Sequence, residues 1–471
     1  MSKVLMVASE AEPFAKSGGL GDVLGALPAA LAAQGHTVAV LLPRYGWIPL
    51  GGLRRVYENL VIWLGETPWR TDVFSTVERG VEVLLVDCPP LYGREGLYGA
   101  AGEDYPDNAI RFAVLSRSAL EIVRRVFRPE IVHCHDWQAA LVGPYMRHRM
   151  ALDPTFFGIK LVLTIHNLGY QGLFPPEILP ALGLDRSLFQ PEALEFYGRV
   201  NFLKGGIVFS DAITTVSRAY AREIQTPEFG HGLDGLLRAR SAVLTGILNG
   251  ADYSQWNPET DPLIAARYSV DDLSGKRACK RDLLVECGFD PDDDRPVIGM
   301  ISRLAAQKGF DLLAEAAEEL VREDLRLVIL GAGDPYYEDR LRRLAAEHPQ
   351  RVFVRIAFDN AFAHKIEAGA DMFLMPSRYE PCGLNQIYSL RYGTVPIVRA
   401  TGGLDDTVDE TTGFKFADYS AAALLDAVRR ALAAYRSREI WREMMIRGMK
   451  KDYSWEASAR QYAALYAGLL G

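Results

Sequence analysis

The chain has 471 residues, of which 49% are hydrophobic and 24% charged, and its formal net charge is −8. This composition is typical of a globular protein of roughly two to four domains, and the acidic balance argues against a dedicated nucleic-acid binder. No stretch approaches the roughly 18 uninterrupted apolar residues of a membrane span. The N-terminus reaches Glu10 too soon for the apolar region of a signal peptide. We therefore expect a cytoplasmic protein that binds neither nucleic acid nor a membrane.

The cysteines are scattered, and no two of them have C-x-x-C spacing. This pattern indicates neither a zinc site nor a disulfide framework. Reduced thiols in a cytosol are the simplest interpretation.

Apolar runs alternate with amphipathic helical stretches along the whole chain. The first half begins with "KVLMVAS" and "HTVAVLLP", and the second holds "PVIGMIS" and "LRLVILGAG". Continuous apolar strands separated by helices are typical of parallel sheets that helices cover on both faces. Gly, Asn and Pro cluster in "ILNGADYSQWNPETDP", which marks a boundary. The sequence thus predicts an α/β protein with two doubly wound, Rossmann-like domains, over residues 1–246 and 247–452, and a last helix over 453–471.

Polar side chains follow the predicted strands at the points where the strands end. The ligand crevice of an open α/β sheet lies at the carboxyl ends of its strands. If the two sheets present these ends to each other, the ligand lies in a cleft between the domains. The polar residues in question are Lys16, His135, Asp136, His166, Asn167, Arg303, Lys308 and Glu380.

The turn "AKSGGLGDV" carries Lys16, Gly18 and Gly19 between a strand and a helix. A helix N-terminus has free N–H groups that suit an anion, glycines allow the anion to approach, and the lysine adds charge. A tight turn with an exposed lysine explains the pattern equally well. The turn is neither a G-x-G-x-x-G dinucleotide fingerprint nor a P-loop.

Two stretches of the second half carry further charges next to helix starts. Arg303 and Lys308, in "ISRLAAQKGFDLL", either bind a diphosphate or are solvated. Glu380 and Cys382, in "PSRYEPCGLNQIYS", precede a helix, so Glu380 either caps that helix or binds a ligand.

The stretch "HCHDWQ" places His133, His135 and Asp136 directly after a strand. Alternate strand residues point to the same face, and only one further ligand is adjacent, so a metal site is disfavoured. A sugar contact by Asp136 beside Trp137 is the better functional interpretation. His166 and Asn167, in "TIHNLGYQG", end another strand, and a lone histidine there is more often structural than catalytic.

Taken together, these stretches resemble the bacterial glycogen synthases and plastidial starch synthases, retaining glycosyltransferases of the GT-B architecture. "SEAEPFAKSGGLGDV" matches the family opening S-E-x-x-P-[FW]-x-K-[TS]-G-G-L-[AG]-D-V. "HCHDW", "TIHNLGYQG", "ILNGAD", "SRLAAQKGFDLL", "PSRYEPCGLNQIYSLRYGTVPIVRATGGLDDTV" and the Tyr-Ser-Trp that begins the last helix follow in family order. The resemblance runs from Lys3 to the end of the chain, and it implies two domains facing across a cleft, with the last helix docking back on the N-terminal domain.

The resemblance implies glucosyl transfer from ADP-glucose to the non-reducing end of glycogen or another α-1,4-glucan, with no cofactor and no metal. Cationic side chains and helix dipoles would stabilise the departing ADP. It implies a catalytic set of Lys16, His166, Arg303, Lys308 and Glu380. The other donor-binding residues would be Gly18, Gly19, Phe358, Cys382, Gly383, Leu384, Thr401 and Gly402. Sugar and acceptor contacts would come from Asp22, Asp136, His166, Asn167 and Asn249.

The sequence departs from the family pattern in ways that keep its chemistry. Phe358, expected to stack on adenine, stands where many relatives carry Tyr, and it keeps the stacking face. Ser17 replaces the commoner Thr and keeps a hydroxyl.

Three rival hypotheses compete with this interpretation. One is a related transferase that uses UDP-glucose or another acceptor, because no residue pattern fixes the base. Another is a non-catalytic glucan-binding protein, which the intact Lys16, Arg303, Lys308 and Glu380 argue against. The third, a nicotinamide-dependent oxidoreductase, lacks its fingerprint.

Overall fold

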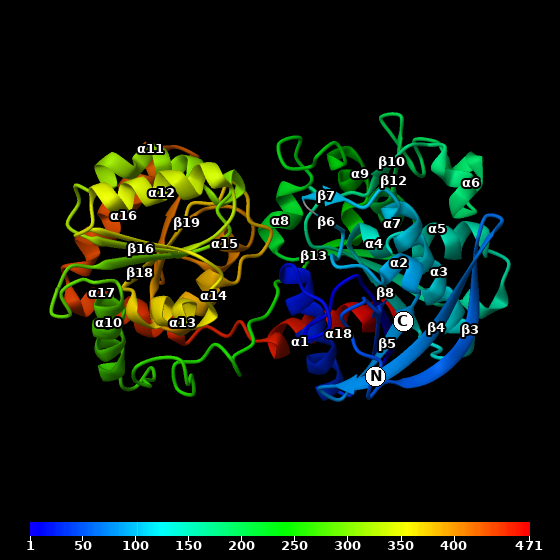
Figure 1. Ribbon diagram of the computed structural model, residues 1–471, viewed down its shortest axis with the longest axis horizontal. Coiled ribbons are helices and arrows are strands. Elements are labelled where there is room, and N and C mark those ends of the chain that lie inside the picture. The colour runs from blue at the N-terminus through cyan, green and yellow to red at the C-terminus, as the bar shows by residue number, and fades with distance from the viewer. Residues whose placement is uncertain (101) are drawn as a thin grey trace. The chain divides into compact units, whose positions relative to one another are not determined.

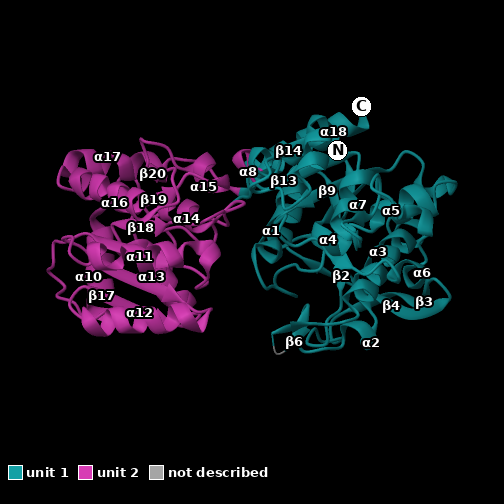
Figure 2. Ribbon diagram, turned by 90° about the horizontal axis from the view of Figure 1, so that it is seen from above, with its two compact units in different colours: residues 1–216, 221–250, 455–471 teal, residues 217–220, 251–454 magenta. Residues whose placement is uncertain are grey.

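The computed structural model describes residues 1–100 and 102–471. The chain divides into two compact units (Figure 2). Unit 1 comprises residues 1–216, 221–250 and 455–471, and unit 2 comprises residues 217–220 and 251–454. The end of the chain therefore returns to the unit in which the chain begins.

Unit 1 is built on a nine-stranded sheet. Its seven strands from β14 to β5 pair in parallel, and β4 and β3 extend the sheet as an antiparallel hairpin. In sheet order the strands are β14 (Leu244–Gly246), β13 (Ala212–Thr215), β9 (Lys160–Ile165), β8 (Ile131–His135), β1 (Lys3–Val7), β2 (Thr37–Pro43), β5 (Val81–Asp87), β4 (Thr67–Glu78) and β3 (Arg54–Leu64).

The central strands of this sheet are buried on both faces. Every residue of β8 is buried, and in β1 and β9 only the first residue is partly exposed. The continuous apolar runs of the sequence are therefore parallel strands, as predicted. β3 differs, because Leu60 and Ile62 are buried while Val61 and Trp63 are exposed. One face of this hairpin meets solvent, which is typical of an antiparallel edge. The hairpin was not predicted from the sequence.

Helices and short strands surround the sheet of unit 1. The last helix, α18, packs against α1 and buries Tyr462 and Tyr466 completely (Figure 1). The helices are α1 (Gly19–Ala33), α2 (Pro89–Tyr92), α3 (Asn108–Arg125), α4 (Asp136–Ala139), α5 (Val142–Pro144), α6 (Ile178–Leu182), α7 (Phe202–Phe209), α8 (Arg218–Glu223), which begins in the residues of unit 2, α9 (Asp234–Ala239) and α18 (Trp455–Leu470). The short strands are β6 (Gly99–Ala100), β7 (Glu103–Asp104), β10 (Leu173–Phe174), β11 (Glu195–Phe196) and β12 (Arg199–Asn201). The short helical turns are η1 (Tyr145–Arg149), η2 (Pro154–Phe156), η3 (Arg186–Leu188) and η4 (Ser241–Val243).

Unit 2 is built on a six-stranded sheet in which every pair is parallel. In sheet order the strands are β17 (Val352–Ile356), β16 (Arg326–Gly331), β15 (Val297–Ile301), β18 (Met372–Met375), β19 (Val395–Arg399) and β20 (Phe414–Phe416). The helices are α10 (Ser274–Glu286), α11 (Phe310–Leu320), α12 (Pro335–Glu347), α13 (Asn360–Gly369), α14 (Asn385–Arg391), α15 (Gly402–Thr407), α16 (Ala421–Tyr435) and α17 (Arg438–Met449), with a short turn η5 (Ala306–Lys308).

Helices cover both faces of the second sheet (Figure 1). Leu327 and Ile329 of β16 pack in one cluster with α11, α12 and α16. Val328 and Leu330, which alternate with them, pack in another cluster with α10 and α13. This alternation along one strand gives the doubly wound arrangement that the sequence predicted.

The cysteines and the helices of the described residues bear on two further predictions. All five cysteines are buried, and none of them forms a disulfide within the described residues. Among residues 1–100 and 102–471, none of the helices combines the length and apolar character that crossing a bilayer requires.

Candidate active site

The Lys-Ser-Gly-Gly turn lies in the loop that connects β1 to α1, at the carboxyl edge of the first sheet. Gly18 is the N-cap of α1, with an extended backbone (φ −165°), and Gly19 is its first residue. A Cβ built at either glycine meets no atom within 4 Å. Neither packing nor a left-handed backbone therefore requires glycine here. The two positions leave open space in front of the free N–H groups of the first helical turn, as a site for an anion needs.

The buried carboxylate of Glu10 stabilises this turn through hydrogen bonds. Glu10 is 3% exposed, and its Oε1 accepts hydrogen bonds from Ser17 Oγ at 2.7 Å and from Tyr98 Oη at 2.5 Å. Its Oε2 accepts the backbone N–H of Ser17 at 2.5 Å and that of Gly18, more weakly, at 3.4 Å. Glu10 thus fixes the loop. Glu10 stands within the motif that opens the family pattern, but no role was predicted for it from the sequence.

Lys16 of the turn is paired with two carboxylates. Its Nζ lies 2.6 Å from Asp22 Oδ1 and 3.2 Å from Glu12 Oε2. Desolvation lowers the pKa of Lys16, but Asp22 and Glu12 raise it more, so the net shift of its pKa is upward. Lys16 is therefore a cation that already neutralises acidic groups. A Cβ at Gly21 would lie 2.9 Å from the Lys16 side chain, so this glycine makes room for the lysine.

The ends of β8 and β9 bring two more expected residues together. Asp136 has a left-handed backbone (φ +56°), unusual for a residue other than glycine, and its Oδ1 accepts the N–H of His166 at 2.7 Å. Burial raises the pKa of Asp136 to about 7. Asn167 is partly exposed, and its Oδ1 accepts the N–H of Gly169 at 3.0 Å. Asn249 is buried with its Oδ1 unpaired in the part of the chain that the structure describes.

In unit 2, Lys308 and Glu380 form the centre of the site. The Lys308 Nζ lies 2.6 Å from Glu380 Oε2, which also accepts a hydrogen bond from Ser377 Oγ at 3.1 Å. Lys308 ends the turn η5, and Gly309 follows with φ +80°, where a Cβ would lie 2.1 Å from the Pro376 carbonyl oxygen. This glycine lets the lysine-bearing turn approach the loop that carries Glu380.

The Thr-Gly-Gly turn packs directly on the backbone of that loop. Gly402 has φ +46°, and a Cβ there would lie 1.9 Å from the Glu380 carbonyl oxygen. A Cβ at Gly403 would lie equally close to the Cys382 carbonyl oxygen. The structure therefore packs Gly402 and Gly403 against the backbone of Glu380 and Cys382.

The remaining expected residues of unit 2 lie around this centre. Arg303 is exposed, and its closest polar partner is Gln307 Oε1 at 3.3 Å. Leu384 is the N-cap of α14, after Gly383 with φ +72°, and Asn385 Nδ2 donates to the carbonyl of Ile301 at 2.7 Å. This bond ties the end of β15 to the start of α14. Phe358 follows β17 at the same edge of the sheet, and its side chain is 97% exposed.

The expected residues therefore form two groups, one in each unit. In unit 1 the structure pairs Lys16 with Asp22 and Asp136 with His166. In unit 2 it joins Lys308 to Glu380 and packs the Thr-Gly-Gly turn on the same loop. Their roles in catalysis stay predictions.

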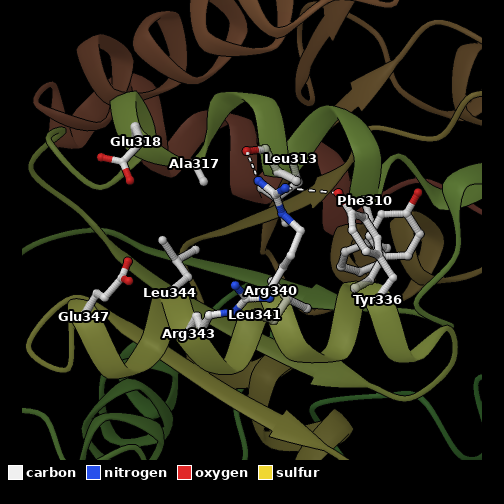
Figure 3. A pocket seen from close by; sticks show the side chains of 12 residues that line it. Phe310, Leu313, Ala317, Glu318, Tyr336, Arg340, Leu341, Arg343, Leu344 and Glu347 are labelled. Carbon is white, nitrogen blue, oxygen red and sulfur yellow. Dashed lines mark hydrogen bonds between the residues drawn. The ribbon is translucent and has the colours of Figure 1, made fainter.

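A groove of about 430 Å³ lies elsewhere, between α11 and α12 on a helical face of unit 2 (Figure 3). None of the expected site residues lines it. Glu318 and Glu347 lie at one end of the groove, and with His348 they form a group of three possible metal ligands, the one such group among the described residues. The lining residues are Phe310, Leu313, Ala314, Ala317, Glu318, Tyr336, Tyr337, Arg340, Leu341, Arg343, Leu344 and Glu347.

Two family models match the chain, one in each half. The starch synthase catalytic domain matches residues 3–239, and the model described as glycosyl transferases group 1 matches residues 289–447. A glycogen synthase of Koribacter versatilis is 52% identical over an alignment that covers 98% of this chain and 97% of that protein. A glycogen synthase of an Anaeromyxobacter species is 53% identical, with 99% of each chain covered.

Solved structures agree with the family models. The catalytic domain of starch synthase IV from Arabidopsis thaliana, bound to ADP and acarbose, superposes with a TM-score of 0.89 at 33% identity, covering 100% of this chain and 99% of that one. A sucrose-phosphate synthase from Thermosynechococcus elongatus, with a TM-score of 0.60 at 20% identity, shares the fold. The predicted α/β GT-B fold is confirmed. The chain belongs to the glycogen and starch synthase family of glycosyltransferases.

Proposed function

We propose that the chain elongates an α-1,4-glucan by transferring glucose from ADP-glucose to the 4-hydroxyl at its non-reducing end, with retention. The observation that carries this proposal is the Lys308–Glu380 pair, packed against a glycine turn at the carboxyl edge of the sheet in unit 2. A cation beside a nearly buried carboxylate can bind both halves of a sugar nucleotide, the charged diphosphate and the sugar hydroxyls.

The residues of unit 2 are assigned to the nucleotide sugar. Arg303 and Lys308 neutralise the diphosphate, and Glu380 accepts hydrogen bonds from glucosyl hydroxyls. The backbone of Thr401 and Gly402, at the start of α15, approaches the phosphates in this proposal. Phe358 stacks on the adenine, because a ring that is 97% exposed has a free face to offer.

The residues of unit 1 are assigned to the sugar and the acceptor. Lys16, with the open backbone at Gly18 and Gly19, contributes positive charge toward the donor. The Asp136 carboxylate fixes the backbone of His166, whose carbonyl faces the anomeric carbon in this proposal. Asp22, Asn167 and Asn249 complete the contacts to hydroxyl groups. We assign unit 1 to the acceptor, with residues 455–471 supporting it, and unit 2 to the nucleotide sugar.

The reaction that these residues support is a same-face substitution. The acceptor 4-oxygen forms a bond to the anomeric carbon while the bond from that carbon to the phosphate oxygen breaks. The proton of the 4-hydroxyl passes to the departing phosphate oxygen of ADP. Lys16, Arg303, Lys308 and the helix N-termini stabilise the negative charge that develops there, a role that Mg²⁺ has in other transferases. Independence of a metal, the absence of other cofactors and a cytoplasmic location stay predictions.

A matrix of donors and acceptors on the purified protein tests the proposal. ADP-glucose and UDP-glucose are each supplied with glycogen, maltooligosaccharide or no acceptor, with and without EDTA. We expect transfer from ADP-glucose to both glucans, unchanged by EDTA. A preference for UDP-glucose would contradict the donor assignment, and loss of activity in EDTA that a divalent ion restores would contradict the proposed role of the cations.

A further inference from the structure

A cluster of three histidines in unit 1 extends from the last helix to His166, with His133 and His135 buried and His166 partly exposed. His133 and His135 alternate on β8 and point to the same face, and their ring centroids are 4.2 Å apart. The Nδ1 of His135 lies 3.0 Å from the Nε2 of His166, which follows the neighbouring strand β9. β8 and β9 pair in parallel with His135 opposite Thr164, so the register of the sheet sets this contact.

The far end of the cluster is anchored by the last helix. His133 Nδ1 lies 2.8 Å from Tyr466 Oη of α18, and its Nε2 lies 2.6 Å from Thr164 Oγ1. Both nitrogens of His133 therefore have partners. Both His133 and His135 are completely buried, so neither ring can reorient without breaking these contacts.

The three rings are neutral at physiological pH. Burial lowers the pKa of His133 and that of His166 to about 3, and lowers the pKa of His135 well below its ordinary value. A neutral imidazole has one N–H donor and one bare acceptor nitrogen. In the contact between His135 and His166, one ring therefore donates and the other accepts.

The second nitrogen of His135 distinguishes the two arrangements. Its Nε2 is buried and has no hydrogen-bond partner in the part of the chain that the structure describes. If His166 donated, His135 would carry its proton on this nitrogen, as an orphaned buried N–H, which proteins rarely tolerate. If His135 donates from Nδ1, its Nε2 carries no proton, and the group without a partner is a nitrogen lone pair instead of an N–H. The second arrangement is favoured, and it leaves the proton of His166 on Nδ1, to which the described residues offer no hydrogen bond.

We propose that His135 is a positioning residue that fixes His166 as the Nδ1–H tautomer, so that His166 presents an N–H donor to a hydroxyl oxygen of the glucosyl group. The ligand in this statement rests on the proposed function, whereas the tautomer rests on the geometry of unit 1 alone. Free neutral histidine favours the proton on Nε2, so the protein selects the less common form.

Nitrogen NMR of protein with isotope-labelled histidine tests the tautomer without any substrate. The signals of His166 are assigned by their loss in His166→Gln. We expect its Nε2 to resonate as a bare acceptor nitrogen and its Nδ1 as a protonated one. A proton on Nε2 of His166 in the wild-type protein would overturn the proposal, whatever the enzyme's substrate.

Two substitutions test the consequence for catalysis. In His135→Asn the side-chain amide can still donate to His166 Nε2, whereas His135→Leu cannot. We expect His135→Leu to lower kcat/KM for ADP-glucose about tenfold, the effect of one hydrogen bond, and His135→Asn to stay within about twofold of wild type. Cys134→Ala is the matched control, since Cys134 is buried in the same strand on the opposite face.

The outcomes separate the two claims. Equal activity of His135→Leu and wild type, or an equal loss in both His135 variants, would overturn the positioning role. If His135→Leu does not fold, the NMR spectra of the wild type and of His135→Asn decide. A wild-type protein that is inactive with ADP-glucose would refute the proposed function and leave the tautomer to the spectrum.

Discussion

Lys308 and Glu380 form an ion pair whose Nζ and Oε2 atoms lie 2.6 Å apart, although they are separated by 72 residues in the chain. The Glu380 side chain is 7% exposed and that of Lys308 is 24% exposed. A nearly buried carboxylate that is held by one cation and by Ser377 has a fixed orientation. This fixed orientation is what a site needs to distinguish sugar hydroxyls.

We expect Glu380→Gln to lower kcat about 100-fold, because a charge-assisted hydrogen bond to the glucosyl group becomes a neutral one, a loss of about 3 kcal/mol. The melting temperature should change little, since solvent still reaches Lys308. Asp311→Asn is the control, because it breaks the exposed pair of Asp311 with Arg378 in the same unit. Steady-state kinetics and thermal unfolding measure both effects. Wild-type kinetics in Glu380→Gln would exclude Glu380 from the site.

Two glycine substitutions should distinguish a glycine that leaves space for a ligand from a glycine that is required for packing. A Cβ at Gly18 meets no atom within 4 Å, so Gly18→Ala should keep the wild-type melting temperature while its kcat/KM for the donor falls about tenfold or more. A Cβ at Gly403 would lie 1.9 Å from the Cys382 carbonyl oxygen, so Gly403→Ala should lose about 1–3 kcal/mol of stability. Full activity in Gly18→Ala would mean that no ligand occupies the space before α1.

Phe358 offers the clearest test of the nucleotide assignment. Phe358→Ala should raise the KM for ADP-glucose about tenfold, because stacking on a base is worth about 1–3 kcal/mol. Phe358→Tyr should be nearly neutral. Neither change should lower the melting temperature, since the ring is 97% exposed. Phe157→Ala, which removes another exposed ring, is the control for kinetics. An unchanged donor KM in Phe358→Ala would contradict the stacking role.

Asp136 should make stability depend on pH. Burial raises its pKa to about 7 in the folded protein, from an ordinary value of about 3.9 in the unfolded chain. The folded state therefore binds the proton more tightly, and this stabilisation is complete below about pH 4 and lost as the pH rises through about 7. We expect the stability of Asp136→Asn relative to wild type to increase by about 1–3 kcal/mol between pH 5 and pH 8, measured by urea unfolding. A difference that does not vary with pH would show that Asp136 is ionised throughout.

Particular elements show how far the sequence alone could lead. The parallel strands could be predicted, because β1, β8 and β9 are buried on both faces and their sequences are continuously apolar. The hairpin of β3 and β4 could not be predicted in this way. Its strands meet solvent on one face, and the register between them shifts at Tyr57, which obscures a regular period.

Some residues of the candidate site could likewise be predicted from the sequence, and others could not. Candidate residues that follow their own strand, such as Lys16 and Glu380, could be named from local patterns. Glu10 could not, because its partners Ser17 and Gly18 reach it only when the chain turns back. The contact of His135 with His166 depends on which strands are neighbours and on their register, and no local pattern contains that information.

The most direct test of the central claim is to follow the label from radioactive ADP-glucose. The protein is incubated with the labelled donor and glycogen, and the product is then digested with β-amylase, which releases maltose from non-reducing ends joined by α-1,4 linkages. We expect the label to enter glycogen and, after brief incubation, to be released almost entirely as maltose. No incorporation from ADP-glucose, or labelled glycogen that resists the digestion, would contradict the proposal that this chain elongates an α-1,4-glucan with retention.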